Sequence, residues 1–282
     1  MNKLTRFLRH LRSMQSINMS LSRGAATSSL RAIDFTDPGS WEFSGFSQNG
    51  EDGIIDVLLR RIARPNRYFV EIGASDGLEN NTSWLAIARR YSGLWIEGDP
   101  ESSEWCRYLF TPLNYGLEIM QKFVTQESAA QVRETALHAD PDVFSLDIDG
   151  NDYHLSQALL ASGFKPKVFV VEYNSAFGPD QSVTIPYRED FRFAKGHGNN
   201  LYYGCSLAGW KKLFAKNGYA FVTVDSNGVN AFFVDPAAFN ESFVEGIRPR
   251  EFTENYSQAR EYKMDWRGQF DLIRDRELFG IQ

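Results

Sequence analysis

Residues 68–77 read Tyr-Phe-Val-Glu-Ile-Gly-Ala-Ser-Asp-Gly, and this stretch decides the fold of the chain. It is a short apolar segment that runs into two glycines, Gly73 and Gly77. About twenty residues further on, a second apolar segment ends in Glu97-Gly98-Asp99. In doubly wound α/β sheets, glycines after the first strand let the backbone approach a ligand, and a carboxylate after the second strand accepts ribose hydroxyls. The two segments therefore predict a nucleoside pocket.

The spacing of the glycines narrows the class of ligand. The pattern Glu71-x-Gly73-x-x-x-Gly77 differs from the dinucleotide pattern G-x-G-x-x-G. It lacks the second close turn that a pyrophosphate needs, and it leaves room for one nucleoside with a short charged tail. This spacing favours S-adenosylmethionine over NAD.

The composition excludes several classes of protein. A length of 282 residues suits one large α/β domain with extensions, and a net charge of −6 argues against general affinity for nucleic acid. Cys106 and Cys205 form no metal-type cluster and no disulfide framework, which fits a reducing compartment. No stretch approaches 18 consecutive apolar residues, so we expect no transmembrane helix and a cytoplasmic protein.

Residues 1–33 differ from the rest of the chain because they contain six basic residues and no acidic one. Four apolar residues follow helical spacing, namely Leu4, Phe7, Leu8 and Leu11. Three interpretations remain open for this segment. It is a disordered tail, or a peripheral membrane contact through residues 1–31 at the cytoplasmic face, or, in a eukaryotic source, a transit peptide.

The order of patterns predicts a doubly wound, mostly parallel, seven-stranded sheet that an antiparallel hairpin closes. Apolar strands are expected at 68–72, 94–97, 117–124, 143–148, 168–173, 219–225 and 230–235. Helices are expected between the parallel strands, among them 81–91, 127–138 and 153–162. The predicted organisation is a basic extension (1–33), a lead-in helix (34–66), the α/β domain (67–235) and a helical C-terminal extension (236–282).

Acidic residues follow the fourth and fifth predicted strands. Asp147 and Asp149 come after the fourth strand, and Glu172 ends the fifth. Ligands bind beyond the carboxyl ends of such strands, so we predict that these three carboxylates are catalytic residues. We predict that Asp147 and Asp149 lie on opposite sides of the strand, so that at most one of them points into the cleft. Asp152 has a structural alternative as the N-cap of the next helix.

The long predicted loop 174–203 has side chains suited to a sugar or another polyol. Asn174, Tyr187 and Arg188 are the candidate substrate contacts, and His197 is a candidate general base. Oxygen ligands at Asp147, Asp149, Glu172 and Asn174 also allow a divalent Mg²⁺ or Mn²⁺, which we do not favour. Two rival functions follow: a metal-dependent glycosyltransferase that uses Asp147 and Asp149, and a non-catalytic module.

Four segments together resemble the FkbM-type methyltransferases, a branch of the class I S-adenosylmethionine-dependent fold. They are Ser47-Gln48-Asn49-Gly50-Glu51-Asp52, Val70 to Gly77, Ile96 to Pro100, and Leu146 to Asp152 with Val170-Val171-Glu172. The match covers roughly residues 44–235. It departs from the family at Ser145, where a lysine is usual, and at Asp149 and Asp152, where glutamate is usual.

The resemblance implies roles for individual residues. The cofactor contacts would be Glu71, Gly73, Ala74, Asp76, Gly77, Glu97 and Asp99. Ser47, Gln48 and Asp52 would lie at the mouth of the cleft and contact the substrate. The expected activity is O-methylation of a hydroxyl on a small molecule or glycan; the oligomeric state is left open.

Overall fold

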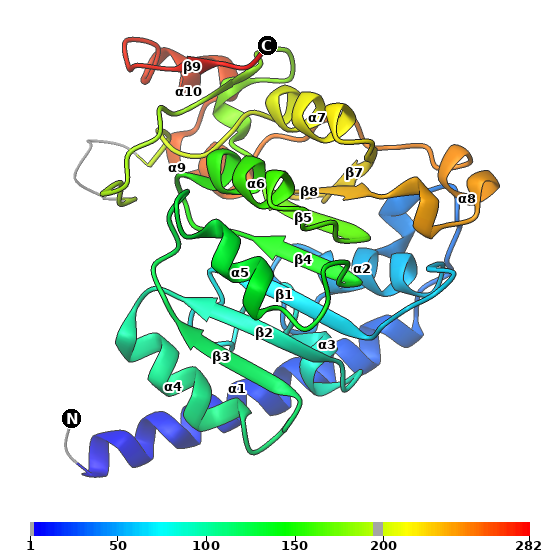
Figure 1. Ribbon diagram of the computed structural model, residues 1–282, viewed down its shortest axis with the longest axis vertical. Helices are drawn as coiled ribbons and strands as arrows, with labels where there is room; N and C mark the ends of the chain where they lie inside the picture. The colour runs from blue at the N-terminus through cyan, green and yellow to red at the C-terminus, as the bar shows by residue number, and fades with distance from the viewer. Residues whose placement is uncertain (1–2, 194–199) are drawn as a thin grey trace.

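The computed structural model describes residues 3–193 and 200–282, and its centre is a single seven-stranded sheet (Figure 1). The strand order is β3-β2-β1-β4-β5-β8-β7. The first five strands are parallel, whereas β8 is antiparallel to both β5 and β7. The sheet consists of β1 (Tyr68–Ile72), β2 (Ser92–Glu97), β3 (Leu117–Gln121), β4 (Val143–Leu146), β5 (Val168–Glu172), β7 (Ala220–Val224) and β8 (Asn230–Val234). The predicted fold class is confirmed.

Helices cover both faces of the sheet because the strands are apolar on both sides. Phe69 and Trp95 pack on one face, against α2 (Glu51–Leu59), α3 (Ser83–Ile87) and α4 (Pro100–Phe110). Val70 and Ile96 pack on the other face, against α5 (Ala129–Thr135), α6 (Asp152–Ala161) and α7 (Leu207–Lys216). Two separate cores result, and the carboxyl ends of the parallel strands stay clear of both helix layers.

Two predicted boundaries differ from the structure for local reasons. The helix expected at 81–91 is only α3, because Asn80 Oδ1 accepts hydrogen bonds from the N–H groups of Thr82 and Ser83 and holds a turn before it. The strand expected to reach residue 148 ends at Leu146. Asp149 then takes a φ of +53°, which turns the chain out of the sheet.

The C-terminal extension holds the long loop before α7 in place. It contains α8 (Glu241–Glu245), α9 (Tyr256–Tyr262) and α10 (Trp266–Asp271). Its last strand, β9 (Phe279–Gly280), pairs antiparallel with β6 (Val183–Thr184), a strand within the loop that the sequence did not predict.

The basic N-terminal segment is one helix, α1 (Lys3–Ser29), which continues through the serine-rich part of the sequence. It is followed by a short 3₁₀ helix, η1 (Pro38–Trp41). Figure 1 shows α1 running along one side of the molecule, with its first turns beside α4. Within the described ranges 3–193 and 200–282, no helix is long and apolar enough to span a bilayer.

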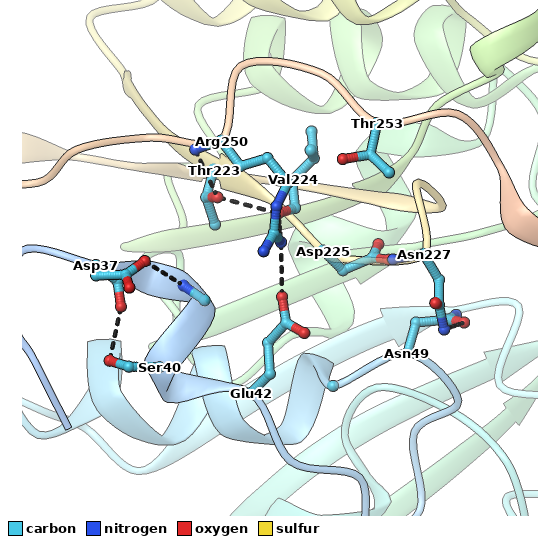
Figure 2. A network of polar contacts seen from close by, with 12 residues as sticks. Asp37, Ser40, Glu42, Asn49, Thr223, Val224, Asp225, Asn227, Arg250 and Thr253 are labelled. Atoms are coloured by element: carbon cyan, nitrogen blue, oxygen red, sulfur yellow. Dashed lines mark hydrogen bonds and ion pairs between the residues drawn. The ribbon is translucent and has the colours of Figure 1, made fainter. Parts of the chain in front are cut away.

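Polar contacts join the lead-in segment to the β7–β8 hairpin (Figure 2). Asn227 Nδ2, in the hairpin turn, donates to Asn49 Oδ1 at 3.0 Å. Arg250 Nη1 donates to Glu42 Oε1 at 2.8 Å and to the Val224 carbonyl at 3.2 Å. These bonds fix residues 42–50 next to the carboxyl end of the sheet, where part of the site lies.

Candidate functional site

The main cavity lies beyond the carboxyl ends of β1, β2, β3 and β4 and has a volume of about 550 Å³. This is the position that ligands occupy in open α/β sheets. Its lining includes the apolar side chains of Val124 and Ile148. Predicted site residues also line it, namely Gly73, Glu97, Asp99, Asp147 and Asp149, together with Ser75.

The turn after β1 requires glycine at residue 73. Gly73 has a φ of +90°, and a Cβ atom there would lie 1.8 Å from the carbonyl oxygen of Asp147. The N–H groups of Gly73 and Ala74 both donate to the Ile96 carbonyl, at 2.9 and 3.3 Å. The turn is therefore held tightly between β2 and β4, with its backbone against the cavity.

Glu97 is fixed at the tip of β2 by two backbone donors. Its Oε2 accepts from the Ser75 N–H and its Oε1 from the Asp99 N–H, both at 2.7 Å. Each carboxylate oxygen can accept a further hydrogen bond from a ligand in the cavity. Asp99 itself caps α4 by accepting from the Ser102 N–H, and these hydrogen bonds with Ser102 lower the pKa of Asp99.

A smaller polar cavity of about 80 Å³ adjoins the first one, and Gly73 and Asp147 line both. Ser47 and Gln48 contribute to it from the segment before α2. Glu71 also lines it and accepts from Thr82 Oγ1 at 2.5 Å and from the Asn81 N–H at 3.0 Å. Burial raises the pKa of Glu71 to about 7, although these hydrogen bonds oppose the rise.

Asp147, Asp149 and Glu172 converge, so that one carboxylate oxygen from each lies within 4.8 Å of the others. Burial, followed by the charge of Asp149, raises the pKa of Asp147 well above its usual value. The pKa of Glu172 is raised well above its usual value by burial and by Asp147. This acidic triad can hold a proton or a hard cation.

Asp147 and Asp149 both line the main cavity, so the expectation that at most one of them points into the cleft was wrong. Residues two apart on an extended strand share a face, so strand alternation does not separate Asp147 from Asp149. β4 ends at Leu146, and Asp149 follows it with a left-handed backbone. Asp152 caps the turn rather than the helix. Its carboxylate accepts from the N–H groups of Ile148 and Gly150.

Several predicted site residues lie elsewhere. Asp52 is buried, and its carboxylate accepts hydrogen bonds from the backbone N–H groups of residues 45–47. These bonds hold in place the segment that lines the small cavity at Ser47. Asn174 is also buried, and its amide bonds to the Leu201 and Tyr203 carbonyls and to the Ala176 N–H. Neither side chain is free to contact a substrate in this arrangement.

Five further predicted residues have different outcomes. Tyr187 bonds to the Gln126 N–H at 3.1 Å, and the exposed Arg188 accepts from Asn151 Nδ2 through its carbonyl oxygen; neither lines the two cavities. Asp76 lines a third groove, beside α1. Gly77 is buried against Phe110. His197 lies outside the described residues.

Sequence reasoning missed the aromatic side of the main cavity. Phe123, after β3, lines it together with Phe191, Arg192 and Phe193 from the loop before α7. The Arg192 guanidinium lies over the Phe123 ring, 3.8 Å from its centroid, and so joins the two segments. Only the aromatic content of the loop hinted at this contact, because the pair is separated by about 70 residues of sequence.

No family model and no curated protein matches the sequence. Among solved structures, the chain is similar to an O-methyltransferase from Bacillus cereus in complex with S-adenosylhomocysteine, at 15% identity over 78% of this chain and 89% of that one, with a TM-score of 0.43. It is also similar to magnesium protoporphyrin IX methyltransferase from Synechocystis PCC 6803 with bound S-adenosylhomocysteine, at 11% identity over 65% and 80%, with a TM-score of 0.41.

A third similar structure is an S-adenosylmethionine-dependent methyltransferase from Clostridium acetobutylicum, at 12% identity over 65% of this chain and 89% of that one, with a TM-score of 0.41. At such identities and TM-scores the likeness assigns no family and no activity to this chain. The sheet order, with antiparallel β8 between β5 and β7, defines a Rossmann-like, doubly wound fold.

Proposed function

We propose that this protein is an S-adenosylmethionine-dependent methyltransferase that methylates a hydroxyl group of a sugar, glycan or similar polyol. The observation that carries the proposal is the position of Glu97. Its carboxylate lies at the tip of β2, fixed by the N–H groups of Ser75 and Asp99, on the cavity that the Gly73 turn also lines. A carboxylate so placed suits the two hydroxyls of a ribose.

The shape of the two cavities fits such a cofactor. The apolar side chains of Val124 and Ile148, with the ring of Phe123, offer a surface for an adenine base. Glu97 lies next to this surface. The small cavity beyond Gly73 continues from the main one and offers space for the amino-acid end.

The charge of the small cavity supports a cationic tail over a pyrophosphate. Glu51, Glu71 and Asp147 line it with Glu79, and its lining contains no lysine or arginine. An ammonium or sulfonium group is stabilised by such carboxylates, whereas a pyrophosphate would be repelled. This argues against a nucleotide-sugar and against NAD.

When bound, S-adenosylmethionine supplies an electrophilic methyl group. The residues of this chain orient the acceptor oxygen and remove its proton. We assign the proton to the acidic triad, because Asp147 lines both cavities and one of its carboxylate oxygens lies within 4.8 Å of those of Asp149 and Glu172. Asp149, Asn151 and Arg192 line the open side and offer hydrogen bonds to further hydroxyls of a polyol.

The test is a transfer assay with methyl-labelled S-adenosylmethionine and a panel of sugars, glycosides and polyols. We expect label on the acceptor, and a rate about 10²–10⁴ times lower in Asp147→Asn. Asp275→Asn, at an exposed position away from the cavities, is the matched control and should keep the rate. Sugar transfer from a nucleotide-sugar in the presence of Mn²⁺, with no methyl transfer, would establish the rival use of the acidic triad instead.

A further inference from the structure

The helix α1 has one face that the body of the protein uses. Four of its residues are buried at spacings of four, three and four, namely Ser13, Ile17, Ser20 and Gly24. Ser13 Oγ accepts from Trp105 Nε1 at 3.2 Å. A Cβ atom on Gly24 would lie 2.4 Å from the Trp84 ring and 3.0 Å from the Gly45 Cα. This buried face attaches the helix closely to the domain.

The first turns of α1 carry a second apolar face that no described residue covers. We call Leu4, Phe7, Leu8 and Leu11 the outer stripe. Their exposed fractions are 66%, 56%, 45% and 45%. At 100° per residue, the centre of this stripe lies roughly 160° around the helix axis from the buried face. The outer stripe therefore points away from the domain and contributes nothing to its core.

Positive charge flanks the outer stripe. Lys3 and Arg12 are exposed and fall on either side of it around the helix. Arg6 and Arg9 lie closer to the domain, over the rings of Tyr108 and Trp105. The whole chain has a net charge of −6, and residues 1–33 contribute +6, so the rest carries −12. Basic charge is thus concentrated where the apolar side chains are exposed.

We propose that residues 3–12 of α1 dock on an anionic lipid surface. The outer stripe enters the boundary between headgroups and acyl chains, and Lys3 and Arg12 lie at the level of the lipid phosphates. A helix with an apolar face and basic flanks binds membranes in this way, in the plane of the interface. Anionic lipid also overcomes the repulsion of the acidic domain, which then faces the solution.

A second copy of the chain fits this face less well. Four side chains over two turns offer much less than the roughly 800 Å² per partner of a stable interface. Two such helices would also bring like charges together along both flanks. The charges and the area therefore both favour lipid.

The test is sedimentation of the full chain with vesicles of phosphatidylcholine, with and without phosphatidylserine. We expect binding to the anionic vesicles that is at least about tenfold stronger than to phosphatidylcholine alone and that weakens with salt. Replacing the outer stripe by glutamine at all four positions should reduce binding by about tenfold or more. Because these side chains are exposed, the variant should fold, which circular dichroism checks.

A matched variant, Met19→Gln with Leu30→Gln, removes two exposed apolar side chains outside the stripe and should bind as the wild type does. Lys3→Gln with Arg12→Gln should lose most of the preference for anionic lipid. Equal binding by the stripe variant and the wild type, or no binding by either, would overturn the proposal. A stripe-dependent dimer in light scattering without lipid binding would also overturn it, in favour of a second copy.

Discussion

Gly73 lies where β1, β2 and β4 meet, and among the glycines that the structure describes it leaves the least space for a Cβ atom. Alanine at residue 73 would combine a φ of +90° with a Cβ atom 1.8 Å from the Asp147 carbonyl. We expect Gly73→Ala to lower the free energy of unfolding by about 3 kcal/mol or more, from strain and overpacking together. Chemical denaturation measures the loss.

Gly163 provides the control for this substitution. It also has a positive φ, +82°, but a Cβ atom there would meet nothing within 4 Å. Gly163→Ala should therefore cost only about 1–2 kcal/mol of backbone strain. If Gly73→Ala and Gly163→Ala lost the same free energy of unfolding, the close approach of Gly73 to Asp147 would contribute nothing to the cost of the substitution.

The buried Glu71 should make stability depend on pH. Its pKa is raised from 4.5 to about 7 in the folded protein, so the folded state keeps the proton longer than the unfolded state as the pH rises. This contribution to stability is complete below pH 4.5 and is lost as the pH rises toward 7. Glu71→Gln has no carboxyl group to titrate at this position, so its stability does not fall for this reason as the pH rises.

The measurement is the free energy of unfolding of both proteins across this pH interval. As the pH rises, the free energy of unfolding of Glu71→Gln should increase relative to that of the wild type, by at most about 1.4 kcal/mol per pH unit. Parallel curves for the two proteins would contradict the raised pKa.

At the residue scale, the sequence located the acids at the cavity better than it predicted how they point. Glu97 and Asp147 line the main cavity and Glu172 lies close to Asp147, as the rule that ligands bind beyond strand ends predicts. The turn at Asp149, with its φ of +53°, lies beyond the end of β4 and leaves no signal in the apolar pattern. Asp52 and Asn174 are buried and bond to nearby backbone, as short polar residues in loops often do.

At the scale of elements, the ion pair between Glu42 and Arg250 joins the lead-in segment to the segment beside β7 (Figure 2). Both side chains are largely buried, at 15% and 34% exposed. A double-mutant cycle with Glu42→Gln and Arg250→Met should give a coupling of about 1 kcal/mol in the free energy of unfolding. Charge-assisted bonds of partly buried groups are expected to exceed surface pairs.

The exposed pair Asp265–Arg267, at 51% and 71% exposed, is the control for that cycle. Its coupling should lie near zero, because solvent screens it. A coupling at Glu42 and Arg250 that is no larger than this would show that the junction is held by other contacts, such as Asn49 with Asn227.

The elements themselves were well predicted where the apolar pattern was long. All seven strands and the hairpin at Asn227-Gly228 were expected from the sequence. The two-residue strands β6 and β9 were not, because pairing between residues about 100 positions apart leaves no local pattern. The full length of α1 was also missed, since its buried face uses serine and glycine as well as Ile17.

At the scale of the molecule, a cluster of acids lies at one edge of the sheet, and α1 carries basic residues but no acidic one. The acidic edge contains both cavities, and α1 presents the exposed apolar and basic residues. The third groove, of about 670 Å³, is lined by Arg23 of α1 and by Ser75 of the turn after β1. Ser75 also lines the main cavity, so the later turns of α1 lie close to it.

The most direct test of the account is calorimetric titration of the protein with S-adenosylhomocysteine, beside Glu97→Ala and the control Glu118→Ala. Glu118 is an exposed acid of the neighbouring strand β3 and lines neither cavity. We expect the wild type to bind S-adenosylhomocysteine. Glu97→Ala should weaken this binding at least about tenfold, or 1.4 kcal/mol, and Glu118→Ala should leave it unchanged. No binding by the folded wild type, or equal binding by Glu97→Ala, would contradict the account.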